Sequence, residues 1–89
     1  MDAAGKTPDD LNRFVSAVRK DLEAIGFHDS ALRLAGIQGA AFTTGSEWLG
    51  ELGAAVNEIL SAHDETLPTD LRTRLGAILG RARQVWPAL

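Results

Sequence analysis

The chain has 89 residues, of which 45% are hydrophobic and 24% are charged, and its formal net charge is −3. This composition is typical of a folded globular protein, and the length suits a single domain over residues 1–89. The chain contains no cysteine, which excludes disulfide and thiolate chemistry. No apolar run reaches the roughly 20 residues that cross a bilayer, and the first residues lack the basic start of a signal peptide. We therefore expect a cytoplasmic protein without membrane contact, with residues 1–6 as a flexible tail.

A first helix is predicted between Thr7 and Gly26. Thr7 is a suitable N-cap, Pro8 fits the first helical position, and the two acidic residues that follow suit the positive end of the helix dipole. Gly26 is the residue type expected just past a helix C-terminus. Apolar residues recur between these limits at steps of three and four, as in an amphipathic helix. They are Leu11, Phe14, Val15, Val18, Leu22 and Ile25.

A second, shorter helix is expected after Gly26, with Asp29 or Ser30 as its N-cap. Phe27 is placed to fold back on the last turn of the first helix. The second helix carries Leu32, Leu34, Ala35 and Ile37. Its end is not defined by the sequence, because Gly36 and Gly39 both weaken a helix.

The segment Thr-Thr-Gly-Ser-Glu-Trp-Leu-Gly, residues 43–50, suggests either a phosphate-binding loop or the start of a third helix. Thr44 and Glu47 have the spacing of a capping box, which uses the free backbone amides that a phosphate would need. A phosphate loop would also need a basic residue, and none lies between Arg33 and Arg72. We therefore predict a helix start and no anion site. The apolar stripe of this helix consists of Trp48, Leu49, Leu52, Val56, Ile59, Leu60 and His63.

A fourth helix is predicted to start at Leu67-Pro68, with Leu67 contacting Leu71 as a hydrophobic staple, and Pro87 stops it. Its apolar stripe consists of Leu71, Leu75, Ile78, Leu79, Ala82, Val85 and Trp86. No strand pattern appears, and the connections are short. The expected fold is therefore all-α, a small up-down bundle of about four helices with one short helix.

Both histidines precede an aspartate, in the pairs His28-Asp29 and His63-Asp64. Four such ligands would hold a metal only if the two pairs met in space. Each pair lies at a predicted helix boundary, where histidine suits the negative C-terminal end and aspartate caps the turn. Acid–base catalysis would need a dry, shaped pocket that a bundle of this size can hardly provide. We expect no metal, no cofactor, no catalytic residue and therefore no enzyme.

Residues 26–32, Gly-Phe-His-Asp-Ser-Ala-Leu, resemble the Asp-Ser-Leu attachment site of acyl carrier proteins, which are acidic four-helix domains of similar length. The resemblance implies that Ser30 carries a prosthetic group. The chain departs from the family at Ala31, where that family has leucine, and in the short segment between the first helix and Ser30. Arg33 also stands in a helix where the family uses acidic residues. A carrier protein is therefore an alternative function, and an N-cap role for Ser30 is the competing interpretation.

Charge is distributed unevenly along the chain. Residues 1–65 carry five basic and eleven acidic side chains, net −6, whereas residues 66–89 carry four arginines and one aspartate, net +3. A nucleic-acid binder that uses these arginines is a further alternative, although a helical wheel places Arg72 and Arg83 on one flank of the fourth helix and Arg74 and Arg81 on the other. We expect their stems to pack along the core edges, opposite acids of the third helix. These acids are Glu47, Glu51 and Glu58.

Small, uncharged residues lie opposite the apolar stripes of the third and fourth helices. An interior glycine costs about 0.8–1.0 kcal/mol relative to alanine, so a close contact should offset it. That contact is a second subunit, a foreign protein or the seam between the two helices; alternatively, the glycines relieve crowding inside the bundle. The two tryptophans near the helix ends are candidate anchors. The candidate interface residues are Trp48, Gly50, Ala54, Asn57, Thr73, Gly76, Ala77, Gly80, Gln84 and Trp86.

The sequence thus predicts a non-enzymatic, small acidic module for protein interaction. The acidic surface favours a basic protein as the partner, as would suit an inhibitor, an immunity protein or a toxin-neutralising protein. The main alternative is a homodimer that closes through the third and fourth helices.

Overall fold

The computed structural model describes residues 8–40 and 44–89. Within these ranges the chain forms four helices, α1 (Pro8–Ala24), α2 (His28–Gly39), α3 (Gly45–Ala62) and α4 (Thr69–Val85), and no strand. The predicted all-α bundle is confirmed, and α2 is its short helix. The predicted N-cap Thr7 and the tail at residues 1–6 lie outside the described residues. None of the helices in the described ranges combines the length and the apolar character of a membrane span.

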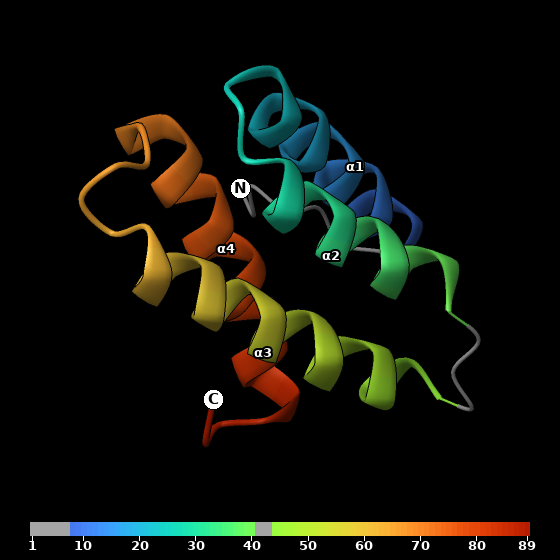
Figure 1. Ribbon diagram of the computed structural model, residues 1–89. Coiled ribbons are helices and arrows are strands. Elements are labelled where there is room, and N and C mark those ends of the chain that lie inside the picture. Colours follow the sequence, from blue (N-terminus) through green and yellow to red (C-terminus); the bar gives the residue numbers. More distant parts are fainter. Residues whose placement is uncertain (1–7, 41–43) are drawn as a thin grey trace.

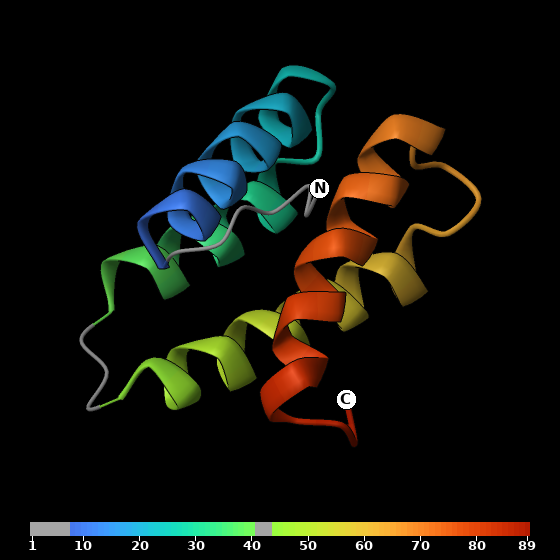
Figure 2. The same cartoon turned by 180° about the vertical axis from the view of Figure 1, so that it is seen from behind.

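The four helices are arranged as two pairs. α1 and α2 run antiparallel to each other, and α4 crosses α3 obliquely (Figure 1). The view from behind shows the same division, with the second pair beside the first and the end of the chain near the end of α4 (Figure 2). All four helices contribute to one hydrophobic core between the pairs. Its largest fully buried side chains are Leu11, Val15, Val18, Leu22, Leu34, Leu52, Val56, Leu75 and Ile78.

The junction between α1 and α2 depends on Gly26, whose φ is 96°. The Gly26 N–H donates to the Glu23 carbonyl at 3.1 Å, and the Phe27 N–H donates to the Leu22 carbonyl at 2.9 Å. These two bonds form the Schellman motif that closes many helices, so the predicted helix end at Gly26 is confirmed. Ile25 was predicted to belong to the apolar stripe, but it lies in this turn and is exposed because α1 has already ended.

The predicted start of α2 was wrong. α2 begins at His28, and its N-cap Phe27 makes no side-chain capping hydrogen bond, so neither Asp29 nor Ser30 is the N-cap. This earlier start places Ser30 inside the helix, where it is buried. Leu32, which was expected among the apolar residues of this helix, is 69% exposed. The buried face of α2 consists of Ser30, Ala31 and Leu34.

The starts of the other two helices follow the sequence more closely. The Thr44 side chain accepts a hydrogen bond from the Glu47 N–H at 3.1 Å, which is one of the two bonds of the predicted capping box. Leu67 is buried before α4, and Pro68 takes the N-cap position of that helix. The end of α4 differs from the prediction, because Val85 and Trp86 are exposed rather than part of the core.

Ion pairs at two places connect the helix pairs. Arg74 of α4 donates to Asp21 of α1 at 2.7 Å and to Asp70 at 3.0 Å. The hydrogen bond that Arg74 donates to Asp21 is the main cause that raises the pKa of the Arg74 guanidinium. Arg33 of α2 pairs with Glu58 of α3. The expectation that the α4 arginines face acids of the third helix is therefore wrong for Arg74, since α1 provides its partner.

We expect the same substitution to have opposite effects at two glycines. Gly26→Ala should lower the free energy of unfolding by about 1–2 kcal/mol, because a Cβ is unfavourable at positive φ. Gly36→Ala should raise it by about 0.8–1.0 kcal/mol, because Gly36 is inside α2 and the added Cβ meets no described atom within 4 Å beyond the neighbouring residues and backbone of its own helix. Urea unfolding followed by circular dichroism measures both values. Equal effects of the two variants would contradict this account of the turn.

Candidate interaction site

Residues 86–89 turn back from the end of α4 onto α3. The Trp86 N–H closes α4 by donating to the Ala82 carbonyl at 2.8 Å. The indole Nε1 of Trp86 donates to the Ser46 carbonyl in the first turn of α3, at 2.6 Å. The Leu89 carbonyl accepts a hydrogen bond from Arg83 Nε at 2.7 Å. These bonds fix both the indole and the residues that follow it.

Two glycines of α3 provide the space for this segment. A Cβ at Gly50 would lie 3.1 Å from Trp86 Nε1. A Cβ at Gly53 would lie 2.7 Å from the Ala82 Cβ and would collide with the Leu89 side chain. Gly53 is buried, and Leu89 packs against the core. Gly50 and Gly53 are thus explained by contacts within the chain.

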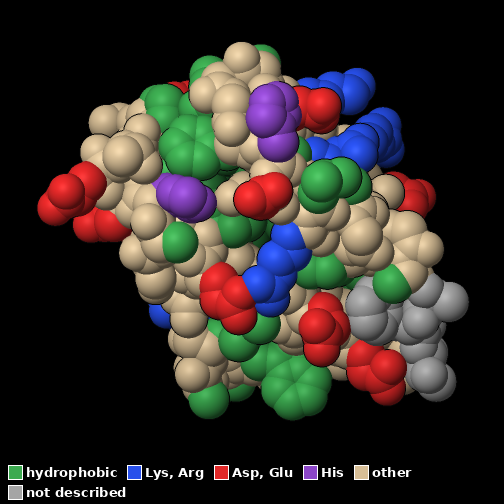
Figure 3. Space-filling model, viewed as in Figure 1, with side chains coloured by type: hydrophobic (Ala, Val, Ile, Leu, Met, Phe, Trp, Pro, Cys, Tyr) green, Lys and Arg blue, Asp and Glu red, His purple; other side chains and the backbone are tan. Residues whose placement is uncertain are grey.

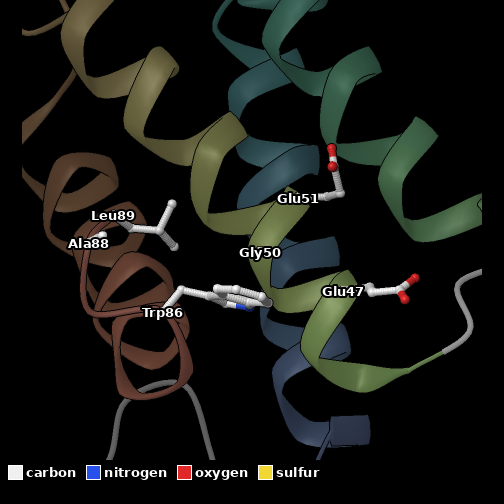
Figure 4. A pocket seen from close by; sticks show the side chains of 6 residues that line it. All are labelled: Glu47, Gly50, Glu51, Trp86, Ala88 and Leu89. Carbon is white, nitrogen blue, oxygen red and sulfur yellow. The ribbon is translucent and has the colours of Figure 1, made fainter.

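An open hollow of about 560 Å³ lies beside residues 86–89. Its lining consists of Glu47, Gly50, Glu51, Trp86, Ala88 and Leu89 (Figure 4). We call it the Trp86 hollow. Trp86 is 44% exposed, its indole lies across the start of α3, and most of the lining is apolar.

Two carboxylates stand at the edge of the Trp86 hollow. Glu47 and Glu51 lie one turn apart on α3 and are both exposed. In Figure 4 they project from the side of α3 that faces away from Leu89. Figure 3 shows acidic side chains over the start of α3 next to an exposed hydrophobic group. Among the described residues that line this hollow, none is basic.

The predicted interface residues do not form one surface. Gly50 and Trp86 contact each other, whereas Trp48 is half-buried against the core. Apart from the neighbouring residues and backbone of α4 itself, no described atom lies within 4 Å of a Cβ built at Gly76 or Gly80, so these glycines do not form a seam with α3. The remaining candidates differ in burial. Asn57, Thr73 and Gln84 are exposed, and Ala54 and Ala77 are half-buried.

The two His-Asp pairs lie in different surroundings. His63 is the C-cap of α3, as predicted, and its ring meets the Phe27 ring edge-on with centroids 4.8 Å apart. His28 begins α2, so its predicted place at a helix C-terminus was wrong. Asp29 and His63 line the same small hollow, whereas His28 lines another. Across residues 8–40 and 44–89, no three potential metal ligands gather at one point.

Ser30, the attachment residue that the carrier alternative requires, is 7% exposed inside α2. A modifying enzyme must reach the serine hydroxyl, and burial of the residue restricts that access. The carrier alternative therefore gains no support from the position of Ser30.

The four arginines of the fourth helix do not converge on one surface. Arg74 and Arg81 lie beside α1, where Arg74 bonds to Asp21 and Arg81 lines a small cavity with residues of α1 and α3. Arg72 and Arg83 instead donate to backbone carbonyls that precede and follow α4. The predicted division into two flanks is consistent with these contacts. A nucleic acid would find no continuous row of arginines on this helix.

Comparison with known proteins identifies no relative of this chain. No protein-family model matches it, and no curated protein and no solved structure matches it. The function is therefore inferred from geometry and chemistry.

The contribution of residues 87–89 was missed by the sequence reasoning, which assigned Pro87 only to the end of a helix. A usable signal was present in the spacing. Gly50 and Gly53 are three residues apart, as are the two large apolar residues Trp86 and Leu89. Two small positions one helical turn apart can receive two large side chains with the same separation.

We expect Gly53→Ala to lower the free energy of unfolding by about 1–3 kcal/mol, because the added methyl group overpacks the contact with Ala82. Gly80→Ala is the matched control on α4. Its methyl group meets no described atom, so helix propensity should raise the stability by about 0.8–1.0 kcal/mol. Urea unfolding gives the energies, and the Leu89 methyl resonances report whether its side chain has left α3. A stabilised Gly53→Ala protein with unshifted Leu89 methyl groups would refute this packing.

Proposed function

We propose that the protein is a non-enzymatic interaction module that binds another protein through the Trp86 hollow. The observation that carries this proposal is the exposed indole of Trp86, which is held at an open apolar surface by its hydrogen bond to Ser46. Tryptophan is among the residues that contribute most to binding energy at protein interfaces. An indole that is already fixed loses little conformational entropy when a partner covers it.

The charge of the chain supports a basic partner. Residues 1–65 carry a net charge of −6, and two of their carboxylates stand at the Trp86 hollow. Such a surface attracts a positively charged protein and increases its rate of association. An inhibitor, an immunity protein or a toxin-neutralising protein would act in this way. A chain without cysteine suits a reducing compartment, and we place the module in the cytoplasm as part of the same proposal.

We expect Trp86→Ala to weaken binding of a native partner roughly 30-fold, as for a hot-spot tryptophan. The control is Leu32→Ala, which truncates another exposed apolar side chain, on α2. Wild type and both variants are immobilised, partners are captured from the native host, and the captured proteins are quantified by mass spectrometry. A partner should be retained by wild type and Leu32→Ala and lost by Trp86→Ala. Retention of every captured protein by Trp86→Ala would reject the Trp86 hollow as the binding site.

A homodimer is the second candidate, and the outer face of α4 favours it. Thr73, Gly76, Gly80 and Gln84 are exposed on this face, and none of them is charged. Another helix can approach closely where side chains are small. The contact would be the same patch on both subunits, as twofold symmetry requires.

The homodimer candidate predicts that Gly80→Leu shifts the protein from dimer to monomer, because the larger side chain separates the helices. Gly36→Leu makes the same change on α2, away from this face, and should leave the dimer intact. Sedimentation equilibrium at increasing protein concentration measures both. A wild-type protein that stays monomeric at millimolar concentration would exclude this dimer.

A further inference from the structure

We infer that the Trp86 hollow selects an arginine side chain of the partner, with the guanidinium stacked on the indole and bonded to Glu47 and Glu51. This inference rests on the proposed function, because it assumes that a polypeptide occupies the hollow. It goes further by naming the side chain that the hollow recognises.

The first support is the position of the indole. Its Nε1–H is bonded to the Ser46 carbonyl, and the ring packs over Gly50, where the absence of a Cβ allows close contact. The exposed part of the ring therefore has a fixed orientation. A cation over the face of a tryptophan is attracted by the negative charge of the π system.

The second support is the pair of carboxylates. Glu47 and Glu51 are four residues apart on α3, so their side chains leave the same side of the helix. Glu58, further along α3, is paired with Arg33. In the described part of the chain, neither Glu47 nor Glu51 takes part in an ion pair, so their charges are not neutralised there.

The third support is the shape and polarity of the Trp86 hollow. Ala88 and Leu89 extend its apolar surface beyond the indole. This surface can cover the aliphatic stem of a long basic side chain together with a neighbouring apolar residue of the partner. The hollow is open on one side, whereas sites for small molecules enclose most of the ligand. A segment of polypeptide that lies across the opening is therefore the better occupant.

Arginine fits this arrangement better than lysine. The guanidinium is planar, stacks on aromatic rings and presents five N–H donors in a fixed geometry that can reach two carboxylates. The lysine ammonium is compact and strongly hydrated, and it cannot stack. The hollow should thus distinguish two side chains that carry the same charge.

The test uses three acetylated, amidated peptides of sequence Gly-Leu-X-Leu-Gly, in which X is arginine, lysine or citrulline. Citrulline has nearly the shape of arginine but no charge. Titration of the ¹⁵N-labelled protein is followed at the indole N–H resonances of Trp86 and Trp48. The arginine peptide should shift the indole N–H resonance of Trp86. It should leave the resonance of Trp48 unchanged, because Trp48 is half-buried against the core. The lysine peptide should bind several-fold more weakly, and the citrulline peptide roughly tenfold more weakly.

The variant Glu47→Gln/Glu51→Gln should lower affinity for the arginine peptide roughly tenfold, because two exposed charge interactions are lost. The control Asp64→Asn/Glu65→Gln removes the same charge from the turn after α3 and should bind as the wild type does. None of the four substituted residues lies in the core, and circular dichroism of both variants verifies that they fold.

Three results overturn the inference. Equal binding of the arginine and citrulline peptides at Trp86 would show that the hollow accepts a polypeptide without selecting a cation, and the proposed function would stand. The same conclusion follows if the Glu47→Gln/Glu51→Gln protein keeps its affinity. If no peptide shifts Trp86 and Trp86→Ala also retains every native partner, the inference and the proposed function both fail.

Discussion

The site depends on two missing side chains in α3. Because Gly50 and Gly53 have no Cβ, residues 86–89 can lie directly against the helix, with the indole of Trp86 over one glycine and Leu89 beside the other. Larger residues at these positions would hold the segment away from α3. The hydrogen bond between Trp86 and the Ser46 carbonyl would then be lost. The hollow would also lose the residues of the C-terminal segment that line it. The chemical properties of this surface thus depend on the close approach of residues 86–89 to the backbone of α3.

The charged residues divide into two groups with different roles. One group holds the helix pairs together: Arg74 connects α4 to Asp21 of α1, and Arg33 connects α2 to Glu58 of α3. The other group stands at the solvent edge of the Trp86 hollow, where its charge is available to a partner. Exposed ion pairs of the first kind stabilise a protein only modestly, so the hydrophobic core contributes most of the stability of the fold.

Much of the fold could be predicted because it follows from local periodicity. The stripes of α1, α3 and α4 recur at helical spacing, and Gly26 has the conformation that glycine alone readily adopts. The start of α2 could not be predicted, since the helix begins at His28 after an N-cap, Phe27, that makes no side-chain capping hydrogen bond. The site was found only in part. Gly50 and Trp86 were recognised as candidates. Which side chain packs against each glycine depends on tertiary contacts, and residue spacing does not predict these.

The bond from Trp86 to Ser46 joins residues that are 40 positions apart in the chain. Closing so long a loop costs entropy that local helix formation does not, so this contact requires that α3 and α4 have already docked. The Trp86 hollow is therefore absent from partly folded forms that keep their helices. A partner that binds this surface would distinguish fully folded molecules from partly folded ones. Its binding would shift the folding equilibrium toward the native state.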